Sequence, residues 1–218
     1  MDSVRKTLIL IGHELKLEWR LKDTGTVAVI LGALSVLLFG FAVRGRGTSV
    51  SGGILWMGFL FTGTLVVTRL FEHERLNGVL DALVLAPGGR GSVHAAKLIS
   101  GWVYVMAAGV VMSLLAHWLW AQRGLTEPRY WMVMVLGALG MAAMGTMVAA
   151  AGSGSGEQPL LALVVLLPLE VPVVICGIRA TQMIAAGHSP QLWVRGLLAY
   201  DTIFVTLSVL LSDYLWEV

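Results

Sequence analysis

Six apolar stretches, each about as long as a membrane-spanning helix, lie at about residues 24–43, 50–68, 98–120, 130–151, 159–178 and 193–211. A helix needs roughly 20 mostly apolar residues to cross about 30 Å of hydrocarbon. Backbone groups in lipid must bond within the protein, and these runs lack the alternation of barrel strands. Only 13% of the residues are charged, against about a quarter in soluble domains. The sequence therefore predicts an all-α integral membrane protein with six transmembrane helices, forming one membrane domain over residues 24–218.

The first 23 residues differ from the apolar stretches that follow. Apolar residues at helical spacing share one face there: Val4, Leu8, Ile11, Leu15 and Trp19. Charged residues are scattered through the segment, and it has no short apolar core followed by a cleavage site, so we expect no signal peptide. The pattern predicts an amphipathic interfacial helix over residues 1–23.

The distribution of lysine and arginine predicts the orientation in the membrane. With the N-terminus in the cytoplasm, nine basic residues lie inside: Arg5, Lys6, Lys16, Arg20, Lys22, Arg69, Arg75, Arg90 and Lys97. Six lie outside: Arg44, Arg46, Arg123, Arg129, Arg179 and Arg195. The positive-inside rule favours this arrangement. We expect a multi-pass protein of the bacterial cytoplasmic (inner) membrane with both termini in the cytoplasm.

A charged, amphipathic loop at residues 69–97 separates the second and third apolar stretches. Its apolar residues repeat at helical spacing and form one stripe: Leu76, Val79, Leu80, Leu83 and Val84. Polar residues lie off that stripe: Glu74, Arg75, Asn77 and Asp81. Pro87, Gly88 and Gly89 predict a sharp end to this helix. Two interpretations stay open: the helix receives a soluble partner, or it only anchors the loop at the membrane surface.

Two acidic residues lie near the middle of apolar stretches, Glu170 in the fifth and Asp201 in the sixth. An acid at the centre of a membrane helix costs about 2.5–3.5 kcal/mol on insertion scales. Pro168 and Pro172 flank Glu170, and each removes a backbone donor, so we expect a bend there. Either the acids line a pathway or bind a cation, or each is protonated and hydrogen-bonded to a neighbouring helix.

Several classes of site have no support in the sequence. The glycine-rich run at residues 152–156 lacks the Gly-Lys-Ser/Thr ending of a phosphate loop, so ATP-driven work requires another polypeptide. The five histidines show no metal-ligand spacing and are interpreted as surface or interfacial residues: His13, His73, His94, His117 and His188. We expect no metal, no nucleic-acid partner and no enzymatic site, and Cys176 is interpreted as a packing residue.

The fourth apolar stretch carries small residues on one helical face: Ala138, Ala142, Gly145 and Ala149. Small side chains let helices approach closely in lipid, where packing replaces the hydrophobic effect. The face is predicted to be a helix-packing seam, with a homodimer contact as the alternative.

The loop also contains a motif of known type, Glu74-x-x-x-Gly78-x-Leu80-Asp81-x-Leu83-x-x-x-Pro87, followed by Lys97 at the start of a span. It resembles the cytoplasmic loop of ABC-2 type exporter permeases, which contains the coupling helix that docks on the ATPase. The fuller string from Arg69-Leu70-Phe71 to Pro87, together with Leu167-Pro168-x-x-x-Pro172, resembles the haem exporter protein B (CcmB) family of cytochrome c maturation. One departure is the loop between spans four and five, which has Glu157-Gln158 where the family often has a basic residue.

This resemblance implies an ABC-2 type permease fold and a half-size permease that forms a homodimer and pairs with an ABC ATPase subunit. It further implies a haem-handling membrane subunit and a periplasmic haem chaperone as partners. ATP would be used by the partner ATPase, and haem would be handled or transported rather than bound as a resident cofactor. The ATPase-coupling residues would be Glu72, Glu74, Gly78, Asp81, Leu83 and Pro87. The candidates for the intramembrane pathway are Pro168, Glu170, Pro172 and Asp201.

Other functions remain open at this point. An ABC-2 type exporter of a lipid, glycan or drug would have the same apolar spans, because nothing in those spans specifies a substrate. A membrane scaffold that translocates nothing is the alternative from a different class. An intramembrane enzyme has little support, since no nucleophile–base pair or metal cluster is visible.

Overall fold

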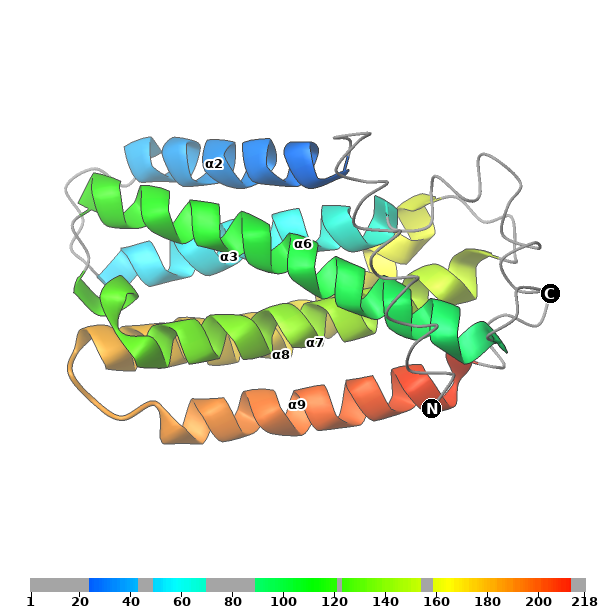
Figure 1. Cartoon of the computed structure of the whole chain (residues 1–218). Helices are drawn as coiled ribbons and strands as arrows, with labels where there is room; N and C mark the ends of the chain where they lie inside the picture. The colour runs from blue at the N-terminus through cyan, green and yellow to red at the C-terminus, as the bar shows by residue number, and fades with distance from the viewer. Residues whose placement is uncertain (1–23, 43–48, 70–88, 121–122, 154–158, 213–218) are drawn as a thin grey trace.

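A computed structural model describes residues 24–42, 49–69, 89–120, 123–153 and 159–212. These residues form α-helices and one short 3₁₀ helix, and no strand occurs among them. The elements are α2 (Thr24–Ala42), α3 (Ser49–Arg69), α6 (Gly89–Trp120), η1 (Arg123–Thr126), α7 (Pro128–Ser153), α8 (Pro159–Ala185) and α9 (Gln191–Leu210) (Figure 1). The predicted interfacial helix over residues 1–23 and the coupling residues between 70 and 88 lie outside the described ranges.

Five of the helices are long and apolar enough to cross a membrane. Their apolar segments are Gly52–Arg69, Gly91–Leu119, Pro128–Ala151, Val164–Ala185 and Gln191–Leu210. Helix α2 has a shorter apolar segment, Thr26–Phe41, within its described residues. The prediction of a multi-pass helical membrane protein is confirmed, whereas the predicted span at residues 24–43 and the ABC-2 fold stay predictions.

The helix boundaries differ from the predicted ones at two places. Helix α6 begins at Gly89, although its span was predicted to begin at residue 98, so the end of the expected loop at 69–97 is helical. Helix α8 continues to Ala185, and only residues 186–190 join it to α9. Hydropathy locates the hydrocarbon crossing, whereas a helix continues past it wherever its backbone stays hydrogen-bonded and its side chains find partners.

Helix α8 passes through both of its prolines without a break. Pro168 and Pro172 lie inside the continuous helix Pro159–Ala185, and both side chains are exposed on the outside of the bundle. A proline ring on that face displaces no neighbouring helix, although each proline still removes a backbone donor. The bend expected at these residues stays a prediction.

The helices lie side by side, with α2 and α9 at opposite edges of the bundle (Figure 1). Helix α3 packs against α2, α6, α7 and α8, so it occupies the interior. Helix α9 packs mainly against α7 and α8. Large apolar side chains on the two edge helices are exposed, as lipid-facing residues are expected to be: Ile30, Leu38, Phe41, Leu192, Ile203 and Leu210.

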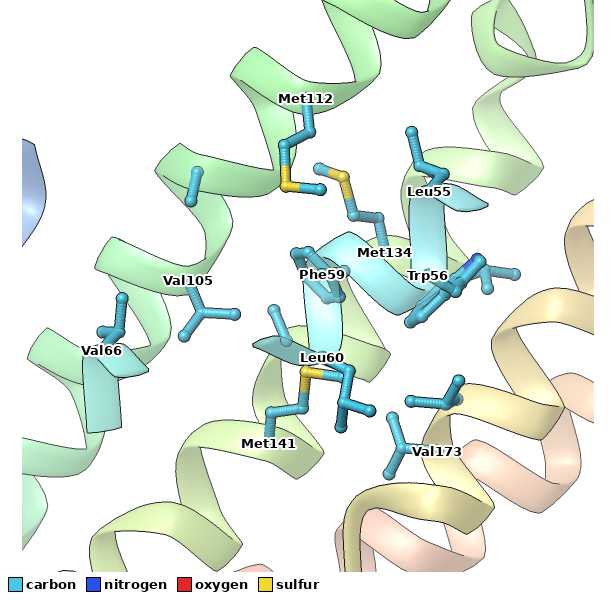
Figure 2. Close-up of a cluster of buried hydrophobic side chains, with 14 of the residues drawn as sticks. Leu55, Trp56, Phe59, Leu60, Val66, Val105, Met112, Met134, Met141 and Val173 are labelled. Atoms are coloured by element: carbon cyan, nitrogen blue, oxygen red, sulfur yellow. The ribbon is translucent and has the colours of Figure 1, made fainter. Parts of the chain in front are cut away.

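The core is built around aromatic residues of α3. Trp56 and Phe59 pack edge-to-face with ring centroids 5.2 Å apart. Met112 of α6 and Met134 and Met141 of α7 surround them (Figure 2). Methionine is flexible and polarisable, so it fills the irregular space beside aromatic rings.

The Trp56 indole fits between two helices because both carry glycine where it passes. A Cβ atom placed on Gly137 of α7 would lie 2.5 Å from the Trp56 ring, and one on Gly177 of α8 would also collide with it. The indole nitrogen donates a hydrogen bond of 2.9 Å to Thr181 Oγ1 on α8. Trp56 therefore joins α3 to α7 and α8 by packing against both helices and by its hydrogen bond to α8.

Replacing Gly177 with alanine is expected to lower the free energy of unfolding by about 1–3 kcal/mol, the usual cost of overpacking a core. The added methyl group meets the rigid Trp56 ring, which cannot turn aside because its nitrogen is bonded to Thr181. The measurement is thermal or denaturant-induced unfolding in detergent. Gly53→Ala in α3 is the matched control, since nothing lies within 4 Å of a Cβ at Gly53. Equal stability of the two variants would contradict the prediction.

The small-residue face of α7 is a packing seam inside the chain, as predicted. Ala138, Ala142 and Gly145 are buried, and a Cβ on Gly145 would collide with Val67 of α3. Ala149 is half-buried. Because Ala138, Ala142 and Gly145 are already buried inside this chain, the alternative interpretation as a homodimer contact is wrong for these three residues.

Candidate functional site in the membrane

Helix α8 presents a polar residue to α3 in the interior of the bundle. Its inward face repeats at helical spacing and is buried throughout: Leu166, Glu170, Val173, Gly177 and Thr181. Glu170 lies on this face with 0% of its surface exposed. Lipid cannot solvate this carboxyl, so its environment is made entirely by neighbouring helices.

The Glu170 carboxyl has one hydrogen-bonded oxygen. Its Oε2 lies 2.7 Å from Oγ1 of Thr64 on α3. The same Thr64 oxygen lies 2.7 Å from the backbone carbonyl oxygen of Leu60, one turn earlier in α3. The other oxygen, Oε1, is buried and has no hydrogen-bond partner in the described part of the chain. Together with Trp56 and Thr181, this contact gives two buried hydrogen bonds between α3 and α8.

Asp201 of α9 is buried beside α7, with 5% of its surface exposed. A Cβ on Gly140 of α7 would lie 2.7 Å from Asp201 Oδ1, so the glycine leaves the space that the carboxyl occupies. Neither Asp201 oxygen has a hydrogen-bond partner among the residues that the structure describes. Unpaired buried oxygens are rare in native proteins and often mark a functional group or an unseen ligand.

Tyr200, the residue before Asp201, joins α9 to α8 beside Glu170. Its hydroxyl donates a hydrogen bond of 2.9 Å to the carbonyl oxygen of Leu169, the residue before Glu170. Its ring stacks at a tilt on Phe204, with centroids 4.3 Å apart. This α8–α9 contact is therefore made by the residues next to each acid, and no hydrogen bond joins the two carboxyls among the described residues.

The predicted site residues thus divide into three groups. Glu170 and Asp201 are buried within the bundle, whereas Pro168 and Pro172 are exposed on its surface. The coupling candidates Glu72, Glu74, Gly78, Asp81, Leu83 and Pro87 lie outside the described residues. Within the described ranges, no group of three or more His, Cys, Asp or Glu residues could hold a metal ion.

His94 is a buried residue that the sequence analysis misassigned. It was interpreted as a surface or interfacial histidine, but it is 0% exposed, and its Nε2 lies 2.6 Å from Oγ of Ser208 on α9. The sequence held a signal for this: His94 is one turn before Leu98 and extends the buried face that continues through Gly101 and Val105. The contact ties the first turns of α6 to the last turns of α9.

Replacing His94 with leucine is expected to lower the free energy of unfolding by about 1–3 kcal/mol, because Ser208 is left buried without its partner. Ser208→Ala should cost a similar amount, and the double variant should cost less than the sum because the two residues form one interaction. Unfolding of the purified protein in detergent provides the measurement. His188→Leu is the control, since that histidine is exposed in the α8–α9 turn. Additive costs for the two single variants would argue against the contact.

Comparison with known proteins places these helices in a wider group. Residues 5–213 match the family model described as CcmB protein. The chain is 31% identical over 169 residues to Heme exporter protein B of Paracoccus denitrificans, covering 76% of each chain. It is 26% identical over 199 residues to Heme exporter protein B of Pseudomonas aeruginosa, covering 88% of each. A third relative of that name, from Rhodobacter capsulatus, is 28% identical over 188 residues, or 82% of this chain and 83% of the relative.

Proposed function

Because the chain belongs to the CcmB protein family, we propose that it is the membrane permease subunit of an ATP-driven ABC complex in cytochrome c maturation. The observation that carries the proposal is the match to the family over residues 5–213, with relatives that are each named Heme exporter protein B. The described residues include five helices that are long and apolar enough to cross a membrane, and this supports a multi-pass subunit. In this proposal the complex serves haem delivery or the release of a haem-loaded chaperone.

The proposed energy source is a separate ABC ATPase, because the printed chain contains no phosphate-binding loop. Its docking element would lie between Arg69, the last residue of α3, and Gly89, the first residue of α6. We assign the contact to Glu72, Glu74, Gly78, Asp81, Leu83 and Pro87. A short, rigid helix wedged into the ATPase would pass its motion to both flanking helices, and α3 is packed against four others.

The remaining partners follow from the same assignment. A haem-handling membrane subunit and a periplasmic haem chaperone would complete the system, with two copies of this chain and two ATPase subunits at its centre. The complex would lie in the bacterial inner membrane with both termini of this chain in the cytoplasm. The small-residue face of α7 is packed inside this chain, so a homodimer would have to form through another face.

Of the two buried acids, Asp201 is the stronger candidate to face a pathway. Both of its oxygens lack partners in the described part of the chain, whereas one Glu170 oxygen is already bonded to Thr64. Pro168 and Pro172 would contribute by bending α8 beside the pathway. Asp201→Asn tests this role, because the variant keeps the size of the side chain and removes its capacity to ionise.

The experiment that tests the proposed function measures covalent haem in c-type cytochromes by haem-stained gel, in a strain that lacks this gene. Haem staining should disappear in the deletion strain and return when a plasmid supplies the gene. Unchanged staining in the deletion strain would overturn the proposal and would favour export of a different substrate. Membrane insertion of the plasmid-borne protein is checked by immunoblot, so that a failure to restore staining can be interpreted.

A further inference from the structure

The Thr64 hydroxyl lies at hydrogen-bond distance from two oxygen atoms, although it has only one hydrogen to donate. A threonine hydroxyl carries one hydrogen and can donate it only once. Thr64 Oγ1 nevertheless lies 2.7 Å from the Leu60 carbonyl oxygen and 2.7 Å from Glu170 Oε2. Both separations are typical of O–H···O hydrogen bonds, so each contact needs its own hydrogen. The carbonyl of Leu60 has none to give, and the second hydrogen must come from the Glu170 carboxyl.

An ionised Glu170 would fit this site poorly. The Thr64 hydrogen would have to leave the Leu60 carbonyl and turn to Glu170. The charge would then be stabilised by one neutral hydrogen bond, since Oε1 has no partner in the described part of the chain. A buried charge without a counter-ion is strongly unfavourable in a medium of low dielectric constant. A neutral carboxylic acid removes the charge and supplies the missing hydrogen.

Within the described ranges, the Glu170 carboxyl is hydrogen-bonded to Thr64 alone, and its Oε1 has no hydrogen-bond partner. The charged residue of α3 nearest to Thr64 in the chain is Arg69, five residues further on at the last position of that helix. From α9, the titratable groups of this region are Tyr200, whose hydroxyl is bonded to Leu169, and Asp201, which is itself an acid. The titratable residues within α7, Arg129 and Tyr130, lie at its first turn, and Arg179 of α8 lies nine residues beyond Glu170, six residues before the helix ends at Ala185.

We propose that Glu170 is a proton-binding site of the membrane domain, where the neutral acid donates a hydrogen bond to Thr64 and so joins α8 to α3. The bound proton is then a structural ligand that acts beside the Trp56–Thr181 hydrogen bond, eight residues earlier in α3 and eleven residues later in α8. The proposal rests on the geometry at Thr64 and is independent of the haem and ATPase roles proposed above.

A direct test is the infrared difference spectrum of the wild-type protein minus Glu170→Gln, in a maltoside detergent that has no ester carbonyl. The expected result is the loss of one carbonyl band of a protonated carboxylic acid near neutral pH. Thr64→Val should keep this band but move it to higher frequency, because the acid loses its acceptor. Thr64→Ser, which keeps the hydroxyl, should leave the band at the wild-type frequency. Loss of the two carboxylate stretching bands in the Glu170→Gln difference spectrum would overturn the proposal.

Thermal unfolding separates a proton from a bound cation. Glutamine can donate to Thr64 as the neutral acid does, so Glu170→Gln should unfold close to the wild-type temperature. Glu170→Met fills similar space without a donor and should unfold at a lower temperature. Thr64→Val is a second way to remove the contact should the methionine variant fail to fold. The proposal would be overturned if Glu170→Gln were as unstable as Thr64→Val and added sodium or calcium stabilised the wild type. The ligand of Glu170 would then be a metal cation and not a proton. Neither readout involves haem or ATP, so a failure of the proposed function would leave this result intact.

Discussion

Replacing Asp81 with lysine is expected to abolish the maturation of c-type cytochromes while the protein remains inserted in the membrane. In the proposed function Asp81 lies on the polar side of the coupling helix and faces the ATPase. Reversing its charge replaces an attraction or hydrogen bond at that surface with repulsion, and like charges across an interface cost several kcal/mol. Haem-stained gels report the loss, and co-purification of the ATPase subunit reports whether docking has failed.

Two companion variants make this result specific. Gly78→Trp places a bulky side chain where close approach is expected, and it should produce the same loss. Glu157→Lys is the control, because it reverses an acid in the other predicted inner loop, where the sequence gives no reason to expect an ATPase contact. Normal ATPase co-purification and normal cytochromes in both Asp81→Lys and Gly78→Trp would remove the coupling role from this loop.

Truncating Trp56 to alanine is expected to lower the free energy of unfolding by about 3 kcal/mol, the lower end of the range for large-to-small substitutions of aromatic core residues. The indole fills the space between Gly137 and Gly177, and neither glycine has a side chain that could move into the cavity. The lower end of the range applies because lipid or detergent is as apolar as the protein core. The substitution therefore removes mainly packing contacts and little hydrophobic free energy. Unfolding in detergent, followed by circular dichroism, measures the change.

Two controls separate packing from other effects of removing Trp56. Trp118→Ala in α6 removes a tryptophan that is 82% exposed and should have little effect on unfolding. Thr181→Val removes the hydrogen-bond acceptor and keeps the ring, so it isolates the contribution of the 2.9 Å bond. A Trp56→Ala variant no less stable than Trp118→Ala would mean that the glycine-lined space closes without the indole.

The sequence predicted the helical class, the family and six spans, of which five are confirmed. It misplaced some helix boundaries and one buried residue, His94. The lengths of the apolar runs were sufficient for the spans, because a lipid environment leaves the helix as the alternative to a barrel. The start of α6 at Gly89 was missed because Arg90, His94 and Lys97 interrupt the apolar run. Polarity in the sequence does not reveal that a polar side chain is buried against another helix.

The candidate site was predictable only in part. Glu170 and Asp201 could be identified as site candidates from the sequence, because an acidic residue within an apolar stretch is costly in a membrane. Their partners could not be predicted, because Thr64 lies 106 residues from Glu170 in the chain and looks like any other threonine in an apolar helix. The same is true of His94 and Ser208, which are separated by 114 residues.

The sequence by itself therefore determined which segments become helices that can cross a membrane, because hydrophobic length and backbone hydrogen bonding are properties of a continuous segment. Only the tertiary structure decided which faces of those helices meet. Trp56 packs between two glycines on different helices, and Thr64 shares its hydroxyl between its own backbone and the carboxyl of Glu170. These contacts depend on how the helices are rotated and placed against one another, which is set by close packing in lipid rather than by any local pattern.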